Sequence, residues 1–159
     1  MAELRKTTRS STLNESQDIR RALRAKTIAV VGASKDPSKD SHTVAAYLKV
    51  NGYRIIPVNP TADRILDEEC YKSLLDVPEE KARLIEVVDI FRPSQDIPPI
   101  VSDAIQLKKQ YGHVATVWMQ LGISNAPAAQ KARDAGLGVV QDACIRIEHA
   151  RTSNRENTN

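Results

Sequence analysis

The sequence predicts an α/β fold: a Rossmann-like three-layer sandwich with a mostly parallel five-stranded sheet between helices. Two observations predict it. Short runs rich in β-branched residues alternate five times with amphipathic segments, which is the pattern of a parallel sheet wrapped by helices. Several of these runs are apolar throughout, as strands covered on both faces must be. The chain of 159 residues is the usual size of one domain, so separate cofactor and substrate lobes are not expected.

The five expected strands are apolar runs that end at polar or turn-forming residues. They are predicted over residues 27–31, 54–58, 84–88, 115–120 and 137–141. Amphipathic segments fill the gaps between them. Ile19, Ala22 and Leu23 give a short apolar face before the first strand, and Asn51-Gly52 closes the helix that follows it, because glycine takes the positive φ of a helix end. Right-handed crossovers are expected to join the strands.

The two ends of the chain differ in composition from its middle. Residues 1–14 and 151–159 are polar without apolar periodicity, so they are predicted as flexible tails around a domain of residues 15–150. The net charge of +3 comes from residues 1–26 and 151–159, since residues 27–150 carry 14 Lys or Arg against 16 Asp or Glu. All six aromatic side chains lie in that slightly acidic middle, which makes nucleic acid an unlikely partner.

Membrane, secretory and metal-binding classes have no support in the sequence. No apolar run approaches the roughly 20 residues that span a bilayer, and the N-terminus lacks the apolar core of a signal peptide. The only cysteines, Cys70 and Cys144, form no C-x-x-C pair, and the three histidines show no ligand spacing. The expectation is a cytoplasmic protein without a metal or a membrane span.

The loop after the first strand is the candidate phosphate site. Gly32 follows the strand directly and lets the backbone approach a diphosphate, while Ser34 and the amides near Ser41, at the start of the next helix, can bind anions. The G-x-G-x-x-G fingerprint is absent. After the second strand Asn59-Pro60 stands where NAD-binding units carry an acidic residue, which favours a nucleotide with an extra ribose phosphate over NAD. A plain strand-ending turn is the other interpretation of this dipeptide.

Six consecutive blocks extend this pattern over most of the chain: IAVVGASKDPSKDSHTVAAYL, NGYRIIPVNP, CYKSLLDVP, VVDIFRPSQDIPPIVSDAI, VWMQLGI and AGLGVVQDACIRIEH. Together they resemble the small stand-alone coenzyme A-binding proteins, which are related to the CoA-binding domain of succinyl-CoA synthetase. The resemblance implies a Rossmann-like domain with its ligand over the first loop and the next two strand ends. It implies that Gly32, Ala33 and Ser34 face the diphosphate and that Lys39 supplies charge to a phosphate. Asn59 and Pro60 would line the adenosine. Phe91 and Arg92 would border the end of the third strand, and Gln120 would lie at the end of the fourth.

Several of these residues also have a purely structural explanation. Arg92 could form an ion pair at a strand end while Phe91 packs in the core, and Lys39 could be a solvated loop lysine. Trp118 lies within an apolar run and is interpreted as packing. His42 is not interpreted as catalytic, because no reacting group can be named beside it.

The resulting prediction is a protein that binds coenzyme A, or an acyl-CoA, non-covalently. No catalysis of its own is predicted, because the ligase chemistry of the synthetases needs a further domain with a phosphorylated histidine. Two alternatives remain open: an NAD(P)-dependent oxidoreductase, and a nucleotide-sensing regulatory module whose basic N-terminal tail contacts a partner. A protein partner or a homo-oligomer is compatible with either.

Overall fold

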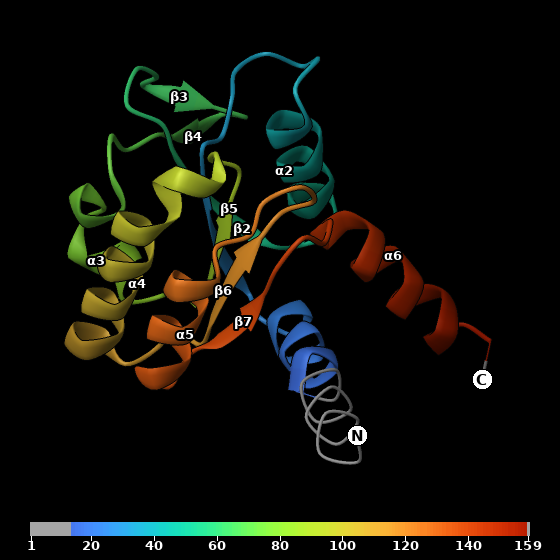
Figure 1. Ribbon diagram of the computed structural model, residues 1–159. Helices are drawn as coiled ribbons and strands as arrows, with labels where there is room; N and C mark the ends of the chain where they lie inside the picture. Colours follow the sequence, from blue (N-terminus) through green and yellow to red (C-terminus); the bar gives the residue numbers. More distant parts are fainter. Residues whose placement is uncertain (1–13, 159) are drawn as a thin grey trace.

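The computed structural model describes residues 14–158, and its centre is a five-stranded sheet in the order β2-β1-β5-β6-β7. The strands are β1 (Thr27–Val31), β2 (Arg54–Val58), β5 (Val87–Ile90), β6 (Thr116–Met119) and β7 (Gly138–Val140). All four pairings between them are parallel. Figure 1 shows helices on both sides of this sheet. The predicted Rossmann-like α/β class with five strands is confirmed.

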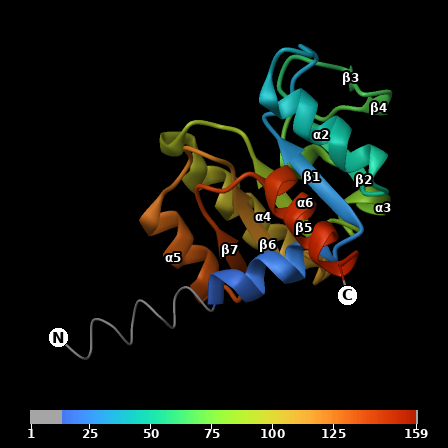
Figure 2. The same ribbon diagram turned by 90° about the vertical axis from the view of Figure 1, so that its right-hand side faces the viewer.

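Two layers of helices cover the sheet. Helices α3 (Glu79–Ala82), α4 (Ile97–Tyr111) and α5 (Ala126–Asp134) pack on one face. Helices α2 (Asp40–Val50) and α6 (Ile145–Glu156) pack on the other face together with a helix of residues 14–23. Figure 2 looks onto this second face, with these three helices in front of the sheet.

The burial of strand β1 explains why the strands are unbroken apolar runs in the sequence. All five of its residues are buried. Ile28 and Val30 belong to the hydrophobic core under α2 and α6, whereas Ala29 and Val31 belong to the core under α4 and α5. A strand with helices on both faces needs apolar side chains at every position, since successive residues point to opposite faces.

The helix of residues 14–23 and helix α6 are held to the elements beside them by hydrogen bonds. The carboxylate of Asp18 accepts a hydrogen bond from the backbone N–H of Val139, on edge strand β7, at 3.0 Å. The Tyr53 hydroxyl donates to the carbonyl oxygen of Leu23, and Tyr47 hydrogen-bonds His149 on α6. Of the helices that the structure describes, none has the length and hydropathy to cross a bilayer.

Three features differ from the sequence-based expectation. The third strand covers Val87–Ile90 rather than residues 84–88, because Leu84 is an exposed residue that follows α3. A two-stranded hairpin of β3 (Arg64–Ile65) and β4 (Glu68–Glu69) lies between β2 and α3 and was not predicted.

The third difference concerns the predicted C-terminal tail. Residues 151–159 were expected to be a flexible polar tail, but α6 continues to Glu156. Polar residues can extend a helix whose first turn is packed, and here Ile145 is fully buried while Arg151 pairs with Glu148 one turn earlier. The predicted N-terminal tail, residues 1–14, lies outside the described residues except for its last position.

Candidate functional site

The ends of β1, β2 and β5 meet directly after the first strand. Strand β1 lies between β2 and β5, and the chain runs from β1 to β2 on one side but from β5 to β6 on the other. Ligands bind at such a reversal of strand order in open parallel sheets. The backbone N–H of Gly32 donates to the carbonyl oxygen of Val58 at 2.9 Å. Gly32 has a φ of +86°, and a Cβ there would lie 3.0 Å from the backbone oxygen of Phe91. Only glycine therefore fits where the three strand ends converge.

The first loop, residues 32–39, is braced by its own side chains. The Ser34 hydroxyl accepts from the Asp36 N–H, and the Asp36 carboxylate accepts from the backbone and the hydroxyl of Ser38. These hydrogen bonds from Ser38 lower the pKa of Asp36. The His42 ring donates from Nδ1 to the carbonyl oxygen of Ser34 at 2.8 Å, so His42 holds the loop in place. Helix α2 starts after Lys39 without a side-chain cap, which leaves its first amides available to a ligand.

Asn59 joins the second strand end to this loop. Its amide nitrogen donates to the carbonyl oxygen of Ala33 at 2.7 Å, and its amide oxygen accepts from the backbone and hydroxyl of Thr61. The contacts with Thr61 form the strand-ending turn that was the other interpretation, whereas the contact with Ala33 was not anticipated. Asn59 also lines the cavity described next.

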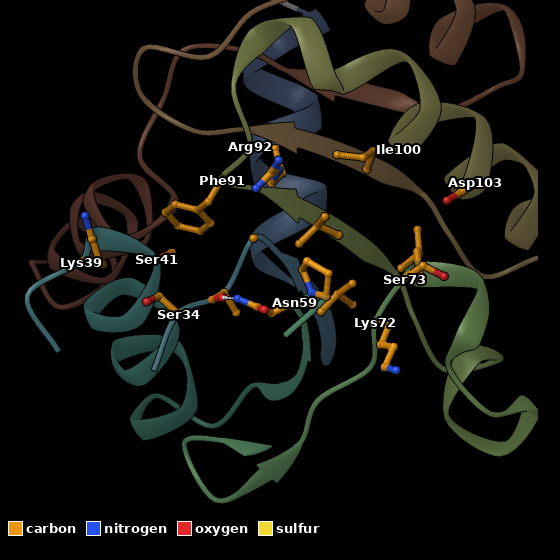
Figure 3. A pocket seen from close by; sticks show the side chains of 16 residues that line it. Ser34, Lys39, Ser41, Asn59, Lys72, Ser73, Phe91, Arg92, Ile100 and Asp103 are labelled. Carbon is orange, nitrogen blue, oxygen red and sulfur yellow. Dashed lines mark hydrogen bonds between the residues drawn. The ribbon is translucent and has the colours of Figure 1, made fainter. Parts of the chain in front are cut away.

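A cavity of about 530 Å³ opens over these strand ends; we call it the first-loop cavity. Figure 3 shows Ser34, Lys39 and Ser41 on one side of it and Lys72, Ser73 and Asp103 on the other, with Asn59 between them. It is lined by Val31, Gly32, Ala33, Ser34, Lys39, Ser41, Val58, Asn59, Pro60, Lys72, Ser73, Leu74, Phe91, Arg92, Ile100 and Asp103.

The lining of the first-loop cavity favours anions. Three of its side chains are cationic, Lys39, Lys72 and Arg92, and one is acidic, Asp103. Neither lysine pairs with a carboxylate within the part of the chain that the structure describes, whereas Arg92 forms an ion pair with Asp96 at 2.9 Å. Burial raises the pKa of the Asp103 carboxyl, which weakens its opposition to a bound anion at acidic pH. The ion pair expected as the structural explanation of Arg92 is present, and Arg92 nevertheless faces the cavity.

The predicted ligand-binding residues divide between two places. Nine of the ten line the first-loop cavity, namely Gly32, Ala33, Ser34, Lys39, Ser41, Asn59, Pro60, Phe91 and Arg92. Their contacts with a ligand stay a prediction. Gln120 does not line this cavity but a second one beside helix α6, to which Phe91 also contributes. Sequence reasoning missed Lys72, Ser73 and Asp103, although Lys72 and Ser73 stand in the CYKSL block used for the resemblance.

A buried polar pair lies under the second cavity. Gln120 is 4% exposed, and its amide nitrogen donates to the Asp89 carboxylate at 2.6 Å. Asp89 is fully buried in strand β5, and its second carboxylate oxygen has no hydrogen-bond partner among the described residues. Burial raises the pKa of Asp89 to about 7, against the lowering by the hydrogen bonds from Gln120 and the backbone. Sequence reasoning placed Gln120 at a strand end but did not single out Asp89.

Trp118 has the packing role expected of it. Trp118 is fully buried, and its indole N–H donates to the carbonyl oxygen of Ala143. Cys70 and Cys144 are half-buried free thiols. Within residues 14–158 no group of three or more His, Cys, Asp or Glu side chains is arranged to hold a metal ion.

Comparison with known proteins identifies the family to which this domain belongs. The sequence profile described as "CoA binding domain" matches residues 26–150, which is most of the chain. The chain belongs to this family. The resemblance inferred from the six sequence blocks is thereby confirmed.

Relatives of two kinds share the domain. An uncharacterized protein of Bacillus subtilis (strain 168), YneT, is 35% identical over 81% of this chain and 89% of its own length. A hypothetical protein from Pyrococcus horikoshii OT3 has a solved structure with a TM-score of 0.76 and 40% identity, over 85% of this chain and 89% of that one. The ADP-forming acetate–CoA ligase II of Archaeoglobus fulgidus is 36% identical over 56% of this chain but only 13% of the ligase. The domain thus occurs both alone and as a small part of a large ligase.

Proposed function

We propose that this protein binds coenzyme A, or an acyl-CoA, non-covalently in the first-loop cavity. The observation that carries the proposal is a cavity with three cationic side chains against one carboxylate at the end of β1, in a chain of the CoA-binding domain family. Coenzyme A carries a diphosphate and a 3′-phosphate, and the lining offers these phosphoryl groups two lysines and an arginine that also pairs with Asp96.

Each part of the cavity has a counterpart in the ligand. The backbone N–H groups of Ala33, Ser34 and Lys35 have no acceptor among the described residues, and together with the uncapped start of α2 they suit the diphosphate. Free N–H groups and the helix dipole both favour an anion. Asn59 and Pro60 line the place proposed for the adenosine. Lys39, Lys72 and Arg92 supply the charge for the phosphates. The proposal contains no chemical step, since none is needed to explain these contacts.

Isothermal titration of the protein with CoA, dephospho-CoA, NAD and NADP tests the proposal. CoA is expected to bind most tightly, and dephospho-CoA about tenfold or more weakly, because a lost charge-assisted contact with a phosphate is worth about 1.5–3 kcal/mol. Equal affinity for all four ligands would refute recognition of CoA. Tighter binding of NADP than of CoA would instead support the oxidoreductase alternative, which a hydride-transfer assay would then examine.

A further inference from the structure

A second cavity, of about 420 Å³, lies beside the first-loop cavity; we call it the helix-α6 cavity. It is lined by Asp40, Thr43, Val44, Phe91, Gln120, Leu121, Ile123, Cys144, Arg146 and Ile147. Its size falls in the range of small-molecule sites, about 300–1,000 Å³. Because Val44 and Ile147 come from helices of the second face, this cavity opens on the α2 and α6 side of the sheet.

The walls of the helix-α6 cavity are mainly apolar. Leu121 is 68% exposed and Ile147 is 47% exposed, so two large apolar side chains are in contact with solvent around one cavity. Single exposed apolar residues are ordinary, but apolar residues grouped around a cavity are typical of a site for an apolar group. The charged residues balance, because Asp40 is the one acid and Arg146 the one base of the lining. The Arg146 guanidinium lies over the ring of Tyr47.

One buried polar group is presented to this cavity in a fixed orientation. The Gln120 amide nitrogen is committed to the buried Asp89 carboxylate, so the amide oxygen is the polar atom left for a ligand. No donor to that oxygen is found among the described residues. A side chain that is 4% exposed and oriented by a buried carboxylate is a preformed acceptor for a ligand N–H.

The two cavities adjoin at Phe91 and at the start of α2. Phe91 lines both of them. Lys39 and Ser41 line the first-loop cavity, whereas Asp40, between them in the sequence, and Thr43 line the helix-α6 cavity. A diphosphate at the first turn of α2 therefore lies directly beside the entrance to the second cavity. An arm that continues from that diphosphate past Phe91 would reach the helix-α6 cavity.

From this arrangement we infer that the helix-α6 cavity binds the acyl group of an acyl-CoA, and that the physiological ligand is a thioester with an apolar acyl chain rather than free CoA. The inference rests on the proposed function of the first-loop cavity. The apolar walls remove the acyl chain from water, and the Gln120 oxygen accepts from an amide N–H of the arm that links the diphosphate to the thioester. The balanced charges of Asp40 and Arg146 give no preference for a charged acyl group.

The test is a titration with CoA, acetyl-CoA, butyryl-CoA and hexanoyl-CoA, together with adenosine 3′,5′-bisphosphate as a probe of the nucleotide part alone. Affinity is expected to rise by up to about fourfold for each methylene that enters the cavity. In Leu121→Gln the ratio of hexanoyl-CoA affinity to CoA affinity is expected to fall toward one. Val50→Gln, at a side chain 86% exposed near the far end of α2, is the matched control and should keep the wild-type ratio.

The outcomes separate the two proposals. If CoA and the bisphosphate bind but the acyl chain adds no affinity, the acyl site is refuted and the proposed function stands. If the acyl chain adds affinity and Leu121→Gln keeps that gain, the acyl group lies elsewhere and the inference is wrong. If neither CoA nor the bisphosphate binds, the proposed function fails and the inference fails with it. Circular dichroism of Leu121→Gln confirms that the comparison is made on folded protein.

Discussion

The first-loop cavity and the helix-α6 cavity adjoin at Phe91 but place their polar groups differently. Lys39 and Lys72 in the first are exposed to water, where an unpaired charge costs little. The second is built over Asp89, a carboxyl buried without a partner for one oxygen, which makes the charged form costly. Solvated lysines can therefore provide affinity for an anion without lowering the free energy of unfolding. The buried Asp89–Gln120 pair fixes the orientation of the Gln120 amide but lowers the free energy of unfolding.

The largest effect is expected where the backbone of the first-loop cavity has no freedom. Gly32→Ala combines a positive φ with a contact of 3.0 Å to the Phe91 oxygen, so it should lower the free energy of unfolding by about 2–3 kcal/mol. Gly52→Ala is the matched control, because its φ is +93° but nothing lies within 4 Å of the added Cβ. That control should lose only about 1 kcal/mol. Urea unfolding measures both, and equal losses would contradict the close approach.

The close approach of Phe91 to Gly32 changes the effect expected of a larger side chain at position 32. A larger residue at position 32 would be expected to obstruct the phosphate path and leave the fold intact. The structure shows that the added Cβ points toward the backbone of Phe91 and the side chain of Arg92. Loss of ligand binding in such a variant would therefore follow from strain at the strand ends.

The free energy of unfolding should depend on pH because of Asp89, the buried partner of Gln120. Because the pKa of Asp89 is raised to about 7 in the folded protein, from an ordinary value near 3.8, the folded state retains a proton that the unfolded state releases between these values. The free energy of unfolding should thus fall as pH rises from 4 to 7, by up to about 1.4 kcal/mol per unit from this group, and level off above 7.

Asp89→Asn sharpens this contrast, since it keeps the shape and an oxygen acceptor for Gln120 but cannot ionise. The variant should be more stable than the wild type at pH 8 by about 1–3 kcal/mol and lack this part of the slope. Urea unfolding across the pH range measures the difference between the two proteins. This difference cancels the contributions of Glu15 and Asp103, because burial raises the pKa of both carboxyls in either protein. Parallel curves would show that Asp89 is ionised in the folded state throughout.

A smaller effect is expected at the brace between the two strand ends. Asn59→Ala removes the hydrogen bond to Ala33 and those from Thr61, which should lower the free energy of unfolding by about 1–2 kcal/mol. CoA affinity should fall by up to about tenfold as the loop loosens. Asn154→Ala, at an exposed position on α6, should change neither quantity. Unchanged affinity in Asn59→Ala would separate this brace from the ligand site.

The smallest effect concerns one exposed cation. Lys72→Gln should weaken CoA binding by about threefold, as expected for a partly solvated charge, and leave the unfolding free energy unchanged. The loss should shrink at high salt, because screening already weakens that contact. Lys109→Gln, in the last turn of α4 and outside the lining of both cavities, is the charge-matched control. An equal loss in both variants would mean that only the overall charge matters.

Much of the fold follows from local patterns, and the exceptions have physical causes. Strands 27–31 and 54–58 agree with β1 and β2 because each is bounded by polar or turn-forming residues. The third strand was predicted too early in the chain, because Leu84 proved to be exposed and Asp89 interrupts the apolar run. The hydrogen bond from Gln120, which follows β6, offsets part of the cost of burying that carboxyl. The β3–β4 hairpin was not predictable from the sequence, because Leu66 and Asp67 take the positive φ of its turn without an Asn-Gly or Asp-Gly pair.

The candidate site was predictable to the extent that it depends on strand ends. Gly32, Asn59 and Phe91 each follow a strand, and parallel strands bring their carboxyl ends to one edge of the sheet. Lys72 follows the hairpin, whose course no periodicity reveals. Gln120 was assigned to the same cavity as the others because its side-chain direction, toward the α2 and α6 face, cannot be deduced from its position at the end of β6.

The contact of Asp18 with strand β7 has a consequence for handling the protein. One carboxylate oxygen occupies the amide of Val139 that would otherwise be free to pair with a strand of another molecule. A truncation or protease cut that removes this aspartate would expose an unpaired strand edge, and the shortened protein would be prone to aggregate during purification. Deletions meant to trim the amino terminus should therefore stop before this residue.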